Sequence, residues 1–409
     1  MIPDARRLPN PSPHNRRPIR SALPAGSAIT ASAAVAMFLI LGLLAAGCAD
    51  PFRPKGRTFA DAAREIYVLN DQAETLSVIN ADTLEIHRDV QWTGSAPNHL
   101  LERDGNLYIT NSLSNSISVI SEDSLEIIGE IYLGYGRNPW MIIPVDGSDE
   151  AYVPNFLAGT VSVVNLKTLE KVDADPSTPD TVDDIDLKDG AAPEYRVASE
   201  GGCYMSGKIF VCNTGYSTSA GSFGEGTVSV IDVATNAVVA TVSTGKGSNP
   251  QAAVAIPSKN EVHVVLTGTN GGTGSDDGQI LVLDADSYEE KDRLDIGGSP
   301  GWSGSGLDEA NGVIYLTGIG GLLSYEYGSL AILHDSSDYI DTGADDELND
   351  LYAGIAVDTE NDRLLVGDFT HDRIVVIDAD LSAGTYTAPG DDDYLSASDG
   401  PVGLYLVEE

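Results

Sequence analysis

The sequence predicts an all-β protein: a seven-bladed β-propeller closed by pairing of its N- and C-terminal strands in one blade. Three observations lead to this fold class: a repeated strand motif, the spacing of its copies, and unmatched strands at the two chain ends. The motif occurs seven times, as TLSVIN (75–80), SISVIS (116–121), TVSVVN (160–165), TVSVID (227–232), QILVLD (279–284), SLAILH (329–334) and RIVVID (373–378). Successive copies end 41 to 67 residues apart, a spacing expected of propeller blades with insertions.

Two further apolar strands precede most copies of the motif. The nearer one reads IYVLN (66–70), LYITN (107–111), AYVPN (151–155), IFVCN (209–213), VHVVL (262–266), IYLTG (314–318) and LLVGD (364–368). The farther one, which is expected to be innermost in each blade, usually follows a proline and is degenerate in the fourth copy, within 197–205. Both faces of a blade pack on neighbouring blades, so continuous β-branched runs suit these strands.

The chain ends predict how the ring closes. The first blade begins at Ile66 without an innermost strand, whereas residues 401–407 form an innermost strand with no blade after it. We therefore expect the two ends to share one blade, which leaves no free strand edge.

The strand phrases Tyr67-Val68-Leu69-Asn70, Tyr108-Ile109-Thr110-Asn111 and Tyr152-Val153-Pro154-Asn155, each followed by SVI or SVV, resemble the YVTN family of β-propellers. The resemblance covers residues 64–409 and is weaker in the fifth and sixth blades. It implies a seven-bladed, extracytoplasmic protein without established catalysis.

The N-terminus has the pattern of an export signal. A segment that contains several arginines and prolines precedes an apolar run, residues 31–47, and this run leads into Leu44-Ala45-Ala46-Gly47-Cys48. This ending resembles the bacterial lipobox, which implies that Cys48 is lipidated and becomes the first residue of the mature protein. We expect a lipoprotein signal peptide (1–47), an anchor and linker (48–63) and the propeller (64–409), located in the periplasm or on the cell surface. An ordinary signal peptide and a membrane anchor are the alternatives.

Charge restricts the partners. The chain has 23 Lys and Arg against 62 Asp and Glu, and after residue 47 its net charge is −43. This field repels nucleic acid and anionic lipids. We therefore expect a protein, glycan or small polar ligand that is neutral or cationic, membrane contact through the lipid anchor only, and a monomer. A solubilising acidic surface explains the same composition.

The cysteine count fits an exported protein. If Cys48 carries lipid, Cys203 and Cys212 remain as a pair. A four-residue turn at 206–209 would place them opposite each other and allow a disulfide. A two-residue turn would put them out of register, and two buried free thiols are the alternative.

Loop lengths and the innermost strands indicate where a site could lie. The loop between the second and third strands has four residues in four blades but is expected to span 214–226, 267–278 and 319–328 in the others, and blade-to-blade connections lengthen on the same face at 173–196, 335–351 and 388–400. Long loops on a rigid scaffold often bind ligands. The candidate ligand-binding residues are the loop aromatics Tyr216, Phe223, Tyr325 and Tyr327, and Asn98, His99, Trp140, Gln251, Trp302 and Tyr352 after the prolines of the innermost strands.

No catalytic motif is present. The six histidines show no metal-ligand spacing, no G-x-S-x-G surrounds a nucleophile, and C-x-x-C-H is missing. No cofactor or metal site is predicted, and the acidic clusters lack the calcium-loop order, so calcium has no motif in its support. We expect a lipid-anchored, non-catalytic binding module. The alternatives are a propeller enzyme, either a lactonase-like hydrolase using Asn98, Gln251 and Glu200 or a cofactor-dependent oxidoreductase, and a passive cell-envelope component.

Overall fold

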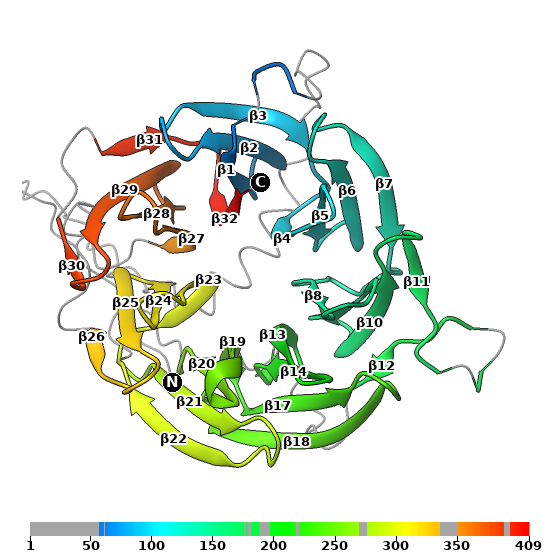
Figure 1. Cartoon of the computed structure of the whole chain (residues 1–409). Coiled ribbons are helices and arrows are strands. Elements are labelled where there is room, and N and C mark those ends of the chain that lie inside the picture. Colours follow the sequence, from blue (N-terminus) through cyan, green and yellow to red (C-terminus); the bar gives the residue numbers. More distant parts are fainter. Residues whose placement is uncertain are drawn as a thin grey trace, which may run out of the picture.

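A ring of antiparallel sheets surrounds a central axis in the computed structural model (Figure 1). The structure describes residues 57–60, 62–175, 177–178, 181–187, 197–217, 221–269, 276–335, 351–387 and 393–408, without the side chains of 301–303. Within these ranges the one helix is a short 3₁₀ turn, Pro257–Lys259. No described helix has the length and apolar character needed to span a bilayer. Cys48 and the predicted signal peptide lie outside the described residues.

The described strands form seven blades, which confirms the predicted fold class. Blade one contains β3 (Ile86–Trp92), β2 (Thr75–Asn80), β1 (Arg64–Asn70) and β32 (Pro401–Glu408). The strands of the next three blades are given from the axis outward. Blade two contains β4 (Pro97–Arg103), β5 (Asn106–Asn111), β6 (Ser116–Ser121) and β7 (Ile127–Tyr132), and blade three contains β8 (Ile143–Pro144), β9 (Glu150–Asn155), β10 (Thr160–Asn165) and β11 (Glu170–Val172) with β12 (Ile185–Asp186). Blade four contains β13 (Ser199–Met205), β14 (Lys208–Asn213), β17 (Glu225–Asp232) and β18 (Ala237–Lys246).

Blades five to seven follow the same order. Their strands are β19 (Pro250–Ile256), β20 (Glu261–Leu266), β21 (Gln279–Asp284) and β22 (Glu290–Asp295); β23 (Pro300–Asp308), β24 (Val313–Gly318), β25 (Gly321–Glu326) and β26 (Ile332–His334); and β27 (Tyr352–Asp358), β28 (Arg363–Asp368), β29 (Arg373–Asp380) and β30 (Thr385–Tyr386) with β31 (Tyr394–Ser396). A separate hairpin, β15 (Tyr216–Ser217) with β16 (Ser222–Phe223), lies between β14 and β17.

Closure of the ring is as predicted. The C-terminal strand β32 pairs with β1 from Arg64 opposite Glu408 to Asn70 opposite Pro401. In Figure 1 these two strands, red and blue, lie side by side at the axis. Because the C-terminal strand becomes the innermost strand of the first blade, the inner edge of β1 is paired.

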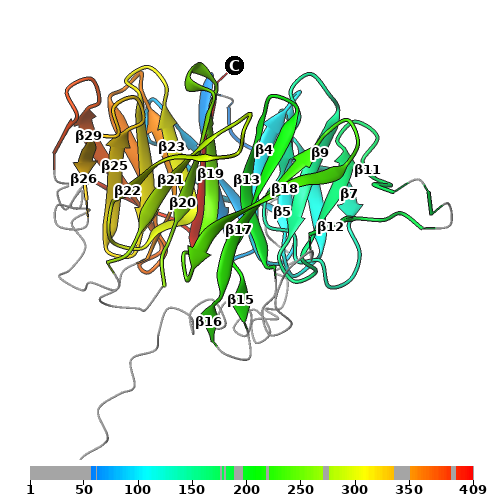
Figure 2. The same cartoon turned by 90° about the horizontal axis from the view of Figure 1, so that it is seen from below.

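The two faces of the ring differ. We call the face that carries the β14–β17 connection and the starts of the innermost strands the loop face, and the face with the ends of the innermost strands, including Glu408, the turn face. Figure 2 shows the β15–β16 hairpin extending from the loop face and the C-terminal end at the opposite one. Every innermost strand therefore runs from the loop face to the turn face.

The repeated Asn and Ser of the motifs have a shared structural role. In blades one to four, the Asn side-chain nitrogen at the end of the second strand donates to a Ser hydroxyl on the third strand, at 2.8 to 2.9 Å. The pairs are Asn70–Ser77, Asn111–Ser118, Asn155–Ser162 and Asn213–Ser229. These side chains are buried, so the bond both fixes the hairpin and satisfies a polar group that water cannot reach.

The repeated aromatic position joins consecutive blades. The Tyr108 hydroxyl of blade two donates to the Leu166 carbonyl of blade three at 2.9 Å. Tyr152 of blade three donates to the Asn236 side chain of blade four at 2.5 Å. In blades two and three the tyrosine of the motif therefore links its blade to the next one around the ring.

The prediction for blade six is wrong in one respect. Its third strand is β25, not the SLAILH segment, whose last three residues form the outermost strand β26. A two-residue turn, Ile319-Gly320, joins β24 to β25, so the long loop expected at 319–328 does not exist. Gly320 has a φ of 90°, a conformation that favours glycine and permits this tight connection.

Two predicted long connections are partly strands. In blades three and seven the outermost strand is divided: β11 and β12 both pair with β10, and β30 and β31 both pair with β29. The described parts of these insertions therefore interrupt outer strands on the rim of the ring (Figure 1). Residues 188–196 and 388–392, and residues 336–350 of the third predicted connection, lie outside the described residues. An outer strand tolerates such an interruption because only one of its edges is paired.

The predicted disulfide is not formed. Met205 pairs with Lys208 across a two-residue turn, which places Cys203 opposite Phe210 rather than Cys212. Both thiols are free and lie in the core between blades four and five. Ser206 and Gly207 have φ angles of 49° and 77°, as a two-residue hairpin turn of this handedness requires.

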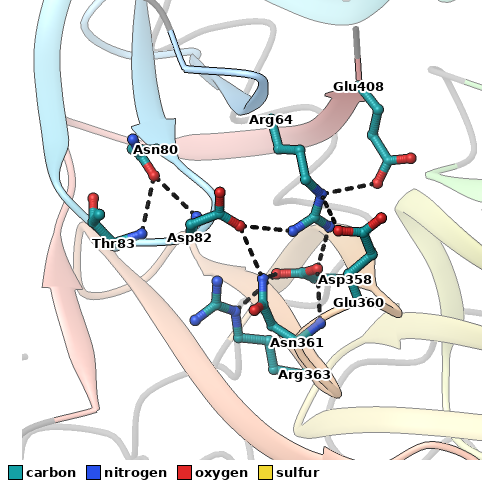
Figure 3. A network of polar contacts seen from close by, with 9 residues as sticks. All are labelled: Arg64, Asn80, Asp82, Thr83, Asp358, Glu360, Asn361, Arg363 and Glu408. Atoms are coloured by element: carbon teal, nitrogen blue, oxygen red, sulfur yellow. Dashed lines mark hydrogen bonds and ion pairs between the residues drawn. The ribbon is translucent and has the colours of Figure 1, made fainter.

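A buried polar network holds the closing blade to blade seven at the turn face (Figure 3). Asp358, fully buried at the end of β27, accepts hydrogen bonds from the Arg64 guanidinium and, at 2.9 Å each, from Arg363 Nε and Asn361 Nδ2. Arg64 also contacts Glu408 at 3.2 Å, so one side chain joins β1, β27 and β32.

The same seam contains a carboxyl with a raised pKa at the loop face. The Asp71 N–H donates to the Gly400 carbonyl at 2.7 Å, which joins the β1–β2 loop to the start of β32. Burial, and then the charges of Glu74 and Asp399, raise the pKa of Asp71 to about 7. The ordinary value is about 4, so the folded protein holds this proton more tightly than the unfolded chain, and the free energy of unfolding decreases as pH rises from about 4 to about 7.

We expect Asp71→Asn to flatten that pH dependence. Because the amide cannot ionise, the variant should be more stable than the parent at pH 8, by about 1–2 kcal/mol, and close to it at pH 4. Urea unfolding from pH 4 to pH 8 measures this, with the exposed turn residue Asp104 changed to Asn as the control. Parallel stability curves for Asp71→Asn and the parent would contradict the expectation.

Candidate functional site

The innermost strands share an irregularity where they enter the ring. In blades two, four and five the register against the second strand shifts just after the first residue, between Pro97 and His99, Ser199 and Gly202, and Pro250 and Ala252. Asn98, Glu200 and Gln251 lie at these bulges. Trp140 has the same place in blade three, directly after Pro139, which bridges to Asn155.

Bulges redirect side chains and are common beside functional sites. In blades seven and one the corresponding residues are Ala353 and Val402, again within register shifts. The ring therefore has polar or amphipathic side chains at this level in blades two to five and small apolar ones in blades seven and one.

The channel inside these strands contains a cavity of about 770 Å³. Asn98, His99, Trp140 and Gln251 line it, together with the side-chain-free Gly201 and Gly202. A second cavity of about 600 Å³ shares His99 and Gly202 with the first and extends along β8 and β32. Pockets of 300 to 1,000 Å³ are typical for small-molecule ligands.

The amides of the cavity have unused hydrogen-bonding groups. Asn98 donates from Nδ2 to the Ser112 hydroxyl, and Gln251 accepts at Oε1 from the Thr267 hydroxyl at 2.8 Å. These bonds fix both side chains and leave Asn98 Oδ1 and Gln251 Nε2 without a described protein partner. Gln251 is only 7% exposed and is one of the residues that line the cavity.

His99 is a neutral donor in the channel wall. Burial lowers the pKa of His99 to about 4, so the imidazole is uncharged at pH 7. Its Nδ1 accepts from the Ile142 N–H at 3.4 Å, which leaves the ring proton on Nε2. The Tyr405 ring lies edge-on, with 5.5 Å between ring centroids.

Trp140 is positioned by the hairpin of the loop face. Its ring lies 5.6 Å from Phe156, and both belong to a cluster with Tyr216 of β15 and Phe223 of β16. Tyr216 and Phe223 are 2% and 7% exposed. The two loop aromatics predicted as ligand contacts are thus buried residues of the hairpin itself and pack in the cluster that includes Trp140.

The remaining predicted residues do not join this cavity. Tyr325 is buried in β25, and its hydroxyl lies 2.9 Å from His263 Nδ1 of blade five. Tyr327 follows β25 at the turn face and packs in the core between blades five and six. Tyr352 is buried between blades six and seven, and the Trp302 side chain lies outside the described residues.

An acidic turn-face mouth is the feature that sequence analysis missed. The residues that line the two cavities near this end include Glu102, Asp146, Asp308, Glu309 and Glu408. None of the lining residues is Lys or Arg. In the sequence, each of these acidic residues lies at or just after the end of an innermost strand. This shared position predicts an acidic mouth only when the innermost strands are known to surround one channel.

The described residues contain no group of three His, Cys, Asp or Glu side chains arranged to hold a metal ion. The channel therefore offers hydrogen-bonding groups, an indole and carboxylates as its recognition elements. Such a set suits recognition of hydroxyl or ammonium groups beside an aromatic face.

Comparison with solved structures shows the class of fold, a seven-bladed β-propeller. The chain resembles a periplasmic gluconolactonase from Pseudomonas aeruginosa (TM-score 0.62, 14% identity, covering 84% of this chain and 99% of that one). It also resembles a 6-phosphogluconolactonase candidate from Bacteroides fragilis (0.61, 13%, 84% and 98%) and hydrazine synthase from Kuenenia stuttgartiensis (0.55, 13%, 76% and 95%).

At these identities the likeness establishes the fold alone. No family model matches the sequence, and no curated protein matches it.

Proposed function

We propose that the protein is a non-catalytic binding module whose site is the loop-face half of the central channel, and that its ligand is a small hydroxylated molecule, neutral or cationic. The observation that carries the proposal is the convergence of Asn98, Trp140 and Gln251 on one cavity from equivalent positions of three blades. An indole face with fixed amides around it is suited to sugars and polyols, which present C–H faces and hydroxyl groups together.

The charge of the channel argues against a phosphorylated ligand. Two of the similar structures are 6-phosphogluconolactonase candidates, whose phosphate group needs cationic or strong N–H donors. The described lining residues provide carboxylates and no Lys or Arg. A sugar phosphate is therefore expected to be repelled.

A lactonase acting on a neutral lactone is the second candidate, favoured by the likeness to the periplasmic gluconolactonase. Such hydrolysis needs a general base within reach of a water molecule. His99 is the imidazole in the cavity, and its ring proton on Nε2 makes that nitrogen a donor rather than a base. The carboxylates that line the cavities belong to the turn-face mouth, whereas Asn98, Trp140 and Gln251 enter at the loop face. The separation of these two groups of residues supports binding over hydrolysis.

The lipid anchor is part of the proposal. Lipidation of Cys48 would hold the propeller outside the inner membrane, where dissolved sugars and polyols can reach the channel. Metabolic labelling with a fatty-acid analogue should mark the protein, and Cys48→Ser should abolish the label and membrane retention. An unlabelled protein cleaved elsewhere would overturn this part alone.

The binding site is tested by calorimetry and intrinsic fluorescence with glucose, sorbitol, N-methylglucamine and glucose 6-phosphate. We expect at least one neutral or cationic probe to bind and the phosphate not to bind. Trp140→Ala should weaken binding about 3- to 10-fold, the contribution of one aromatic contact, whereas Trp92→Ala on the outer strand β3 should not. Binding that is unchanged in Trp140→Ala, or preference for glucose 6-phosphate, would refute the proposed site. In a separate assay, hydrolysis of added gluconolactone by the protein would support the second candidate.

A further inference from the structure

The outermost strand of blade four has a long edge without a strand partner. β18 is the last strand of its sheet, which has the order β13-β14-β17-β18, and it lies on the rim of the ring (Figure 1). With ten residues it is longer than any other described strand. Its outer edge pairs with no described strand, and an unpaired strand edge is a template for pairing with another chain.

The sequence of β18 lacks the features that usually protect such an edge. Proteins protect exposed edges with charged side chains, proline or a short strand. From Ala237 to Gly245, β18 contains no charged residue and no proline. The other described outermost strands of six or more residues are β3, β7 and β22, and each contains charged side chains: Arg88 and Asp89 in β3, Glu130 in β7, and residues 290–293 and 295 in β22.

A bulge shared by several blades makes the difference clear. The outermost strands of blades two, four and five each have one extra residue at an equivalent register shift, namely Ile128, Val239 and Lys291. Lys291 provides a charge, which binds Glu261 at 2.8 Å. Val239 is instead apolar and 49% exposed, and the neighbouring Val238 is also exposed. Burial of such apolar surface by a partner is favourable.

Contacts with blade five limit the free part of this edge. Arg293 of β22 donates from Nη1 to the Thr244 carbonyl at 3.3 Å, and a second register shift lies at the same end of β18. The free segment is therefore Ala237–Ser243. At about 3.4 Å per residue it is about 23 Å long, which is sufficient for a strand of ordinary length.

The charges around this segment favour a second copy of the same chain. Two neutral segments can pair antiparallel about a two-fold axis without bringing like charges together. If the axis lies near Ala240, the exposed Lys246 of each copy reaches the β17–β18 turn of the other copy. That turn begins at Asp232, whose carboxylate binds Lys208 at 2.9 Å and whose side chain is still 23% exposed. Opposite charges therefore meet at both ends of the pair.

We propose that β18 is an interface at which two copies of this chain pair antiparallel, so that blade four of one copy continues into blade four of the other. This inference does not depend on the proposed function, and it differs from the monomer expected from the sequence. Pairing of two strand edges buries little surface, and small interfaces are weak. We therefore expect a reversible dimer with a dissociation constant on the order of 10–100 µM.

The net charge of the chain determines how this dimer responds to salt. After residue 47 the chain has a net charge of −43, so two copies repel each other at a distance. Salt screens this repulsion but has little effect on pairing between neutral strands. The dimer should therefore become stronger as salt rises, whereas a basic peptide that bound the same acidic protein would be released.

Sedimentation velocity and hydrogen exchange of the full chain test the proposal. The protein is kept in an excess of detergent micelles, so that its apolar N-terminal run does not drive association. We expect a dimer whose association constant is at least about threefold larger at high than at low salt. We also expect the amides of Ala237–Ser243 to exchange at least about tenfold more slowly when most of the protein is dimeric, while those of β7 do not change.

Val239→Lys introduces the protecting charge that blade five has at this bulge. In a two-fold dimer both copies carry the new charge, and we expect the dissociation constant to increase at least about tenfold. Ile128→Lys is the matched control, because Ile128 is the equivalent bulge residue of β7, is 54% exposed and undergoes the same change of charge. It should leave the dissociation constant within about twofold. If Val239→Lys does not fold, hydrogen exchange of the unaltered protein decides alone.

Three results would overturn the inference. A monomer at every concentration, with exchange in β18 independent of concentration, would show that the edge has no partner of its own kind. Slow exchange of β18 in the monomer would assign the edge to another segment of the same chain. A dimer that responds equally to Val239→Lys and Ile128→Lys would have its interface elsewhere. None of these results bears on the proposed channel site.

Discussion

A chain that ends at Gly400 is expected to be unfolded under conditions where the full chain is folded. The deletion of 401–409 removes the innermost strand of blade one, with its seven paired positions along β1. It also removes the buried side chains Val402 and Leu404 and half-buried Tyr405 from the packing between blades seven, one and two. At about 1.5–3 kcal/mol for each large apolar side chain, the loss exceeds about 5 kcal/mol, which is comparable with the whole stability of many proteins.

Circular dichroism and urea unfolding measure this result. A chain lacking only residue 409 is the control and should match the full chain. Addition of a synthetic 400–409 peptide to the truncated chain should restore folding in part, since the strand binds through the ladder along β1. A melting temperature within about 2 °C of the full chain would show that closure contributes little to stability.

Sequence patterns identified the fold because each level of the pattern has a structural counterpart. The apolar runs are strands packed on both faces, and the repeated Asn and Ser form one hydrogen bond in each of four blades. The pairing of the two chain ends could be predicted from the sequence because an open ring would expose strand edges on both sides of the gap. Identical local contacts repeated around a ring are what a sequence can reveal without an alignment.

Blade six shows where this reasoning stops. Its third strand could have been 321–326 or 329–334, since both are short apolar runs. The choice depends on the two-residue turn at Ile319-Gly320, which brings β25 directly against β24. A run of two glycines, Gly320 and Gly321, was the available signal, because such residues permit tight turns. Loop length alone instead predicts a long loop at 319–328.

The site was only partly predictable for a different reason. Asn98, His99, Trp140 and Gln251 could be named because they follow the prolines at the start of innermost strands, and they do line one cavity. The direction of a side chain at this level depends on the register shift just after the first residue of the strand. A shift of one residue moves a side chain to the opposite face of its sheet. The long-loop argument failed at Tyr216 and Phe223 because aromatic loop residues gain more by packing on Phe156 and Trp140 than by facing water.

Asp358→Ala is expected to destabilise the ring by about 3–5 kcal/mol, the usual effect of removing one member of a buried ion pair. Asp358 is fully buried, and it neutralises two guanidinium groups, Arg64 and Arg363, whose side chains are 8% and 10% exposed. Without the carboxylate, both cations stay buried at the seam without their main partner (Figure 3). Urea unfolding at pH 7 gives the difference in free energy.

Asp82→Ala is the matched control for this prediction. Asp82 also contacts Arg64, at 3.0 Å, but its side chain is 55% exposed, and an exposed ion pair contributes about 0–1 kcal/mol.

Burial alone would raise the pKa of Asp358, but hydrogen bonds from Arg64 and Asn361 and the charge of Arg363 lower it below its usual value. Its contribution is therefore complete at neutral pH and is lost as pH falls below about 4. The difference between Asp358→Ala and the parent should shrink at pH 3; equal effects of the two substitutions at pH 7 would show that the seam does not depend on this buried carboxylate.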